Sequence, residues 1–71
     1  MPDQPRTLTP RQTELIILLC NGASVREAAA AMGISWNTAR ATAEDIRERL
    51  GALTMPHAIA IWIRQGGRPF G

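Results

Sequence analysis

The basic residues of this chain are all arginine. Its 71 residues include eight arginines, no lysine and six acidic residues, which gives a formal net charge of +2. Guanidinium groups are planar and always charged, and they bind phosphate oxygens and guanine edges through paired hydrogen bonds. Arginines also form salt bridges within proteins. This composition therefore favours a nucleic-acid ligand but is also compatible with a purely structural use of the arginines.

Residues that carry catalysis or bind metals are scarce. Cys20 and His57 are the only cysteine and histidine, which excludes an internal disulfide and an ordinary zinc site. There is no Ser–His–Asp set and no glycine-rich phosphate loop, and Gly66-Gly67 is typical of a helix stop. We therefore expect neither an enzyme nor a cofactor. Cys20 is predicted to be a packed thiol, and His57 a surface or capping residue.

Composition predicts an all-α fold. Hydrophobic residues make up 45% of the chain and eleven of them are alanine, whereas valine and phenylalanine occur once each and tyrosine never. Such a chain favours closely packed helices over a sheet. One small domain of this length has a marginal core, which a dimer would help to stabilise. No apolar run reaches the roughly 20 residues of a membrane span and the first residues do not form a signal peptide, so we expect a cytoplasmic protein.

Capping signals divide the chain into four predicted helices. Thr9 and Ser24 each begin a capping-box pattern, and Ser35 is a third N-cap. The predicted helices span about 10–21, 25–32 and 36–50, and a last one starts near 54–56 and stops at 66–67. The expected core faces are Ala39, Ala43, Ile46 and Leu50 on the third helix, and Ala58, Ile59, Trp62 and Ile63 on the last. Residues 1–7 are expected to form a flexible arm, 8–66 the domain, and 67–71 a flexible tail.

The segment between the second and third helices has the pattern of a helix-turn-helix. Ala29 supplies a small residue where two helices cross, and Gly33 can adopt the left-handed turn conformation without a Cβ penalty. Ile34 then supplies an apolar plug, and Ser35 caps the next helix. We therefore predict a compact four-helix domain that contains a helix-turn-helix, with a bend at Gly33 that presents Arg40 outward.

These residues belong to a longer stretch, from Leu8 to about Ala52, that resembles the LuxR-type (NarL/GerE) DNA-binding domain without a gap. The stretch reads LTPRQTELIILLCNGASVREAAAAMGISWNTARATAEDIRERLGA. The resemblance implies a transcription regulator whose third helix enters the major groove of double-stranded DNA, and whose fourth helix forms the contact of a homodimer on two-fold symmetric sites. Because only seven residues precede the predicted domain, we expect a stand-alone domain without a sensory half.

The resemblance and helical spacing together assign roles to individual residues. The expected base-reading residues are Trp36, Asn37, Arg40, Ala41 and Glu44. The expected DNA-backbone contacts are Arg26 and Thr38 from the resemblance, Arg47 from its place one turn past Glu44, and Arg11 from the surplus of charge near the chain ends. The expected dimer or partner surface consists of Ile17, Ile61 and Arg64, in which the two isoleucines would form an exposed apolar patch.

Departures from the family pattern keep a second function open. Positive and negative charges cancel over residues 36–50, and a neutral reading helix binds phosphates weakly by itself. The residues that replace the usual family types include Gln12, Val25, Ala39 and Thr42. The alternative function is a protein-interaction module of the same fold, which modulates another regulator or RNA polymerase without reading DNA.

Three of the candidate side chains also have a structural alternative. Trp36 either contacts DNA or a partner, or lies across the second helix with its indole nitrogen exposed to water. Arg40 either reaches a base or pairs with Glu44, four residues further along the helix. Arg47 either reaches a phosphate or pairs with a carboxylate of its own helix.

Overall fold

Four helices follow one another along the part of the chain that the structure describes. The structure is a computed structural model and describes residues 8–69. The helices are α1 (Pro10–Cys20), α2 (Val25–Met32), α3 (Trp36–Leu50) and α4 (Met55–Arg64), and residues 8–69 contain no strand. The all-α prediction is thereby confirmed, and the second and third helices have their predicted bounds. The arm predicted over 1–7 lies outside the described residues.

Side-chain caps begin each helix, as the sequence predicts for the first three. Thr9 and Ser24 form complete capping boxes, while Ser35 and Thr54 each accept one backbone N–H from the first turn of their helix. A side-chain cap of this kind stabilises a helix by about 1 kcal/mol. α2 and α3 both end at a glycine in the left-handed conformation, Gly33 for α2 and Gly51 for α3.

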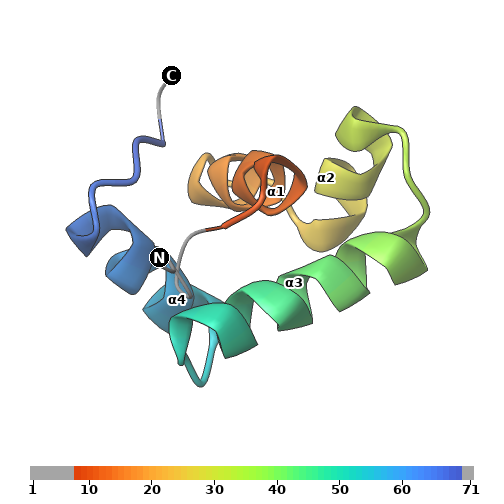
Figure 1. Ribbon diagram of the computed structural model, residues 1–71. Coiled ribbons are helices and arrows are strands. Elements are labelled where there is room, and N and C mark those ends of the chain that lie inside the picture. Colours follow the sequence, from red (N-terminus) through yellow and green to blue (C-terminus); the bar gives the residue numbers. More distant parts are fainter. Residues whose placement is uncertain (1–7, 70–71) are drawn as a thin grey trace.

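α3 is the central element, because it packs against each of the other three helices. α2 lies beside its N-terminal end and α4 beside its C-terminal end (Figure 1). The core between them is apolar throughout, and its largest fully buried side chains are Leu15, Ile16, Ile46 and Leu50. The predicted core positions of α3 are all buried, and so are Ala58 and Trp62 of α4.

The C-terminal end of the domain differs from the prediction in two places. Ile63 was expected in the core but is 47% exposed, and Ile59, one turn earlier on the same face of α4, is only half-buried. The tail predicted to be flexible is packed on the domain over its described part, residues 67–69. The Gly67 N–H donates to the Trp62 carbonyl at 2.9 Å, and the side chain of Asn21 donates to the Pro69 carbonyl at 3.0 Å.

The approach of Gly67 to Trp62 explains why a glycine is needed there. A Cβ atom at this position would lie 2.3 Å from the indole ring, closer than any side chain tolerates. The helix stop that the sequence predicts at Gly66-Gly67 therefore has a second role, because it lets the following backbone cross the face of a core residue.

Candidate nucleic-acid interface

The turn between α2 and α3 has the geometry that the sequence predicts for a helix-turn-helix. Gly33 adopts a left-handed conformation with φ of 71°, and the Ile34 N–H donates to the Ala29 carbonyl at 3.0 Å. Ala29 is buried where the helices meet, and Ile34 packs against the core. Ser35 then begins α3, and its hydroxyl oxygen accepts the Thr38 N–H at 3.1 Å. The turn thereby fixes which face of α3 points away from the domain.

The outward face of α3 carries all five residues predicted to read bases. Trp36, Asn37, Arg40, Ala41 and Glu44 are exposed, whereas the opposite row of the same helix is buried. The side chain of Arg40 is 58% exposed, so the prediction that the bend presents it outward is confirmed. The remaining exposed residue of the first turn is Thr38, whose hydroxyl oxygen accepts a hydrogen bond from the Ser35 hydroxyl at 2.9 Å.

Trp36 joins α2 and α3 at the edge of this face. The guanidinium carbon of Arg26, on α2, lies 4.8 Å from the centroid of its ring, and that of Arg40 lies 5.3 Å from the same centroid. Both distances fall within the roughly 6 Å range of cation–π attraction. Trp36 therefore lies against a side chain of α2, as one interpretation of the sequence predicted. It also remains 39% exposed, which leaves it accessible to DNA or a partner, as the other interpretation requires.

Arg40 also pairs with Glu44, as the sequence allowed. The two side chains approach to 3.5 Å, but both are more than half exposed. Surface pairs of this kind contribute between zero and about 1 kcal/mol. This pairing is thus weak enough for either group to exchange it for a ligand.

Arg47 makes a contact that neither interpretation of the sequence predicted. Its guanidinium donates to the main-chain carbonyl of Leu53 at 3.1 Å, and the residue is half-buried. Because α3 ends at Gly51 and the chain then turns toward α4, the Leu53 carbonyl comes within reach of this side chain. Arg47 accordingly stabilises the α3–α4 connection, and this hydrogen bond favours a structural role over the predicted phosphate contact.

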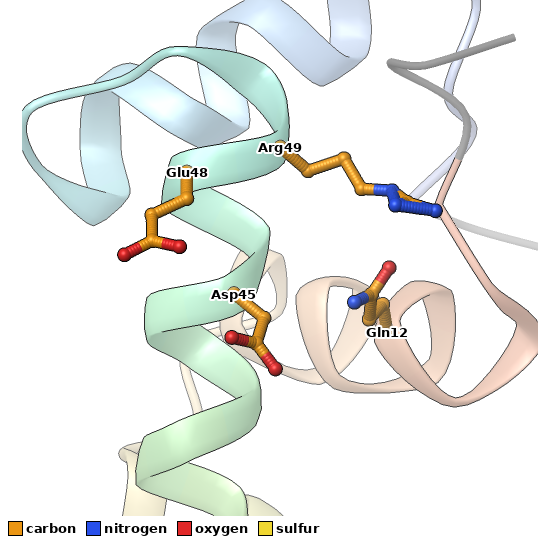
Figure 2. A pocket seen from close by; sticks show the side chains of 4 residues that line it. All are labelled: Gln12, Asp45, Glu48 and Arg49. Carbon is orange, nitrogen blue, oxygen red and sulfur yellow. The ribbon is translucent and has the colours of Figure 1, made fainter.

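The other charged residues of this end of α3 line a shallow, open depression with Gln12 of α1. Asp45, Glu48 and Arg49 form its α3 side, and Arg49 extends across toward the Gln12 side of the depression (Figure 2). The two carboxylates outnumber the one guanidinium and would repel a phosphate backbone. This surface is consequently a poor candidate for DNA contact.

Arg11 and the predicted dimer residues lie apart from the Trp36 cluster. Arg11 forms an exposed ion pair with Glu14 on its own helix, at 3.4 Å. Ile17 and Ile61 are half-buried and pack against the core of their own domain, so the exposed apolar patch expected from them is not formed. Arg64 is exposed near the end of α4. Sequence reasoning missed Leu53, which is 83% exposed in the α3–α4 connection.

The remaining titratable side chains have structural surroundings. Cys20 is half-buried, and desolvation raises the pKa of its thiol, as expected of a packed cysteine rather than of a nucleophile. His57 is exposed and its Nδ1 accepts the Leu53 N–H at 3.4 Å, in keeping with the predicted capping role. Residues 8–69 hold no cluster of three or more metal-ligating side chains. Over the same residues, no helix combines the length and the apolar character that a membrane span requires.

Comparisons with family models, with curated proteins and with solved structures gave no match to this chain.

Proposed function

We propose that this protein is a sequence-specific DNA-binding regulator of transcription that inserts the N-terminal half of α3, residues 36–44, into the major groove. The observation that carries the proposal is the exposed row on this half of the helix, with Arg26 and Arg40 held on one aromatic ring beside it. The major groove is about 12 Å wide and admits an α-helix. The resemblance of residues 8–52 to the LuxR-type domain implies the same placement of α3 in the major groove.

The side chains of this row match the chemistry of base edges. The Arg40 guanidinium can donate to O6 and N7 of guanine, and the Asn37 amide can pair with adenine. Ala41 is exposed and small, so it leaves space for a thymine methyl group. Arg26 and the Thr38 hydroxyl, on either side of the turn, would contact the phosphates at the edge of the groove.

The proposal includes a homodimer and a cytoplasmic site of action. Two copies related by a two-fold axis would bind inverted half-sites about one helical turn apart. α4 is the helix that the resemblance assigns to the dimer contact, and it presents Ile63 and Arg64 to the surface. A palindromic binding site would support this arrangement, and a single asymmetric site would contradict it.

A second candidate function is a protein-interaction module. Positive and negative charges cancel over residues 45–50, and Arg47 is engaged with the Leu53 carbonyl, so this half of α3 offers a phosphate little net positive charge. The neighbouring Leu53 is an apolar side chain almost fully exposed to water. Another regulator or RNA polymerase would be the partner on this reading, and DNA affinity would be absent.

The experiment that tests the proposal is selection of bound fragments from a random duplex library, followed by competition binding of variants to the selected site. Arg40→Ala should weaken binding to the selected site by about 1–3 kcal/mol and relax the preference for one guanine. Arg68→Ala is the matched control, since it removes the same charge from an exposed residue beyond the end of α4.

The control variant should lose much less affinity and should keep the base preference. If the unmodified protein selects no preferred fragment, the result would contradict sequence-specific DNA binding and favour the protein-interaction module. Equal, base-independent losses in both variants would show that Arg40 contributes charge alone, and would contradict its role as a base contact.

A further inference from the structure

We propose that Trp36 is a positioning residue, which holds Arg26 and Arg40 in register for one stretch of DNA before the DNA arrives. This inference rests on the proposed function and deepens it, because it names the residue that sets the specificity of the reading face. The observation behind it is that guanidinium groups from two different helices contact one exposed indole ring.

The geometry places two like charges on one exposed ring. Since the two guanidinium carbons lie 4.8 and 5.3 Å from one centroid, their separation is smaller than the roughly 12 Å width of the major groove. Two cations at this separation repel each other, and the negative face of the ring offsets part of that repulsion. Without the ring, the two side chains would move apart.

Neither arginine has a stronger partner that would hold it in place. Within residues 8–69, Arg26 forms no ion pair, and the Glu44 partner of Arg40 is more than half exposed at 3.5 Å. Arginine side chains lose much rotamer freedom when a ligand fixes them. A ring that restricts them beforehand lowers this entropic cost and thus increases affinity.

The shared ring also links the two kinds of DNA contact. Arg26 comes from α2 and is placed to contact a phosphate, while Arg40 comes from α3 and is placed to contact a base. Phosphate contacts fix the register of a protein on the duplex, and base contacts read the sequence. Trp36 therefore couples the contact that fixes the register of the protein on DNA to the contact that reads the base sequence. Its loss should reduce the discrimination between DNA sites as well as the affinity.

The first test needs no DNA. Aromatic ring currents shift the NMR signals of groups that lie over an indole, so the side-chain signals of Arg26 and Arg40 should be displaced in the unmodified protein. Trp36→Leu should remove both displacements, and Trp36→Phe should retain part of them. Leu53→Ala, another exposed apolar position, should leave both unchanged. Undisplaced signals in the unmodified protein would overturn the inference.

The second test measures binding to the selected duplex. Trp36→Leu should weaken it about tenfold, and Trp36→Phe by less, because phenylalanine keeps an aromatic face. The base preference at the position read by Arg40 should weaken too. Circular dichroism and the free energy of unfolding verify that each variant is folded, and Leu53→Ala is again the control.

A double-mutant comparison separates positioning from direct contact. In a chain that already carries Arg26→Ala and Arg40→Ala, Trp36→Leu should cost no further affinity. An equal tenfold loss in that background would mean that Trp36 touches DNA itself, which overturns the positioning role. An unmodified protein that binds no duplex would overturn the proposed function, whereas normal binding with an unaffected Trp36→Leu variant would overturn this inference alone.

Discussion

Two arginines of α3, Arg40 in its N-terminal half and Arg47 in its C-terminal half, have opposite surroundings. In the N-terminal half, residues 36–44, Arg40 is exposed beside an aromatic ring and has only a weak surface partner. In the C-terminal half, residues 45–50, Arg47 is half-buried and donates to a main-chain carbonyl. The same residue type on the same helix is thus offered to a ligand at one end and used to hold the fold at the other.

The difference arises from what lies within reach of each side chain. A turn follows the C-terminal half and brings the Leu53 carbonyl to Arg47, whereas Arg40 in the N-terminal half lies beside the Trp36 ring and the exposed Glu44 carboxylate. The Leu53 carbonyl accepts a hydrogen bond from the Arg47 guanidinium, whereas an aromatic face occupies none of the N–H donors of Arg40. Arginine content alone therefore says little about DNA contact until the acceptors around each guanidinium are known.

The largest expected effect is on stability, and it concerns the α2–α3 turn, which orients the N-terminal half of α3. Gly33→Ala should lower the free energy of unfolding by about 1–2 kcal/mol, because an L-residue is strained in the left-handed conformation. Nothing lies within 4 Å of the added Cβ atom, so steric overlap adds no cost. Urea denaturation measures the change.

Gly33→Asn is the matched control for this turn, since asparagine tolerates the left-handed conformation better, and it should cost less than Gly33→Ala. Equal stability of Gly33→Ala and the unmodified protein would mean that the turn does not require a left-handed residue.

A smaller effect on stability should distinguish Arg47 from Arg40. Arg47→Ala should lower the free energy of unfolding by about 1 kcal/mol, because it removes the hydrogen bond to the Leu53 carbonyl. Arg40→Ala should change stability by less than about 0.5 kcal/mol, as expected for an exposed pair. Urea denaturation of the two variants in parallel gives both values.

Binding at several salt concentrations completes this comparison. Folded Arg47→Ala should keep the salt dependence of the unmodified protein. A log–log slope shallower by about 0.9, with unchanged stability, would instead identify Arg47 as a phosphate contact and erase the distinction between the two halves.

The smallest expected effect concerns the Arg40–Glu44 pair. Glu44→Gln should change the free energy of unfolding by less than about 0.5 kcal/mol, because both side chains are largely exposed. It should also raise affinity for duplexes of unrelated sequence, since it removes a negative charge from the proposed DNA-facing side. Glu48→Gln, on the C-terminal half, is the matched control and should raise this affinity less. A loss of stability above 1 kcal/mol for Glu44→Gln would contradict the view that this pair is weak.

The sequence predicts most of the fold because its local signals agree with one another. The capping boxes at Thr9 and Ser24, the left-handed Gly33 and the spacing of the buried α3 residues each depend on neighbours within one or two turns. The contact of Gly67 with Trp62 and the hydrogen bond from Asn21 to Pro69 were not predicted. The first is a local contact at the end of α4, whereas the second joins residues 48 apart in the chain and depends on how the chain end returns to the domain, which no local pattern encodes.

The candidate site likewise combines features that local patterns predict with features that depend on tertiary packing. Helical spacing was sufficient to predict that the row from Trp36 to Glu44 faces outward, and it allowed the Arg40–Glu44 pair. The approach of Arg26 to Trp36 depends on how α2 packs on α3, and the bond of Arg47 to Leu53 depends on the course of the next turn. The sequence offered the placement of Trp36 across α2 as one alternative, but it predicted neither Arg26 as the contact nor the Leu53 carbonyl, because both depend on tertiary packing.

The most direct test of the central claim is an NMR titration of the folded protein with the duplex that it selects. We predict that the largest changes in amide and side-chain signals fall on residues 36–44 and on Arg26, with small changes over residues 45–50 and at Leu53. Changes that instead concentrate on the C-terminal half of α3 and on α4, or signals that stay fixed at saturating duplex, would contradict the claim that the N-terminal half of α3 reads DNA.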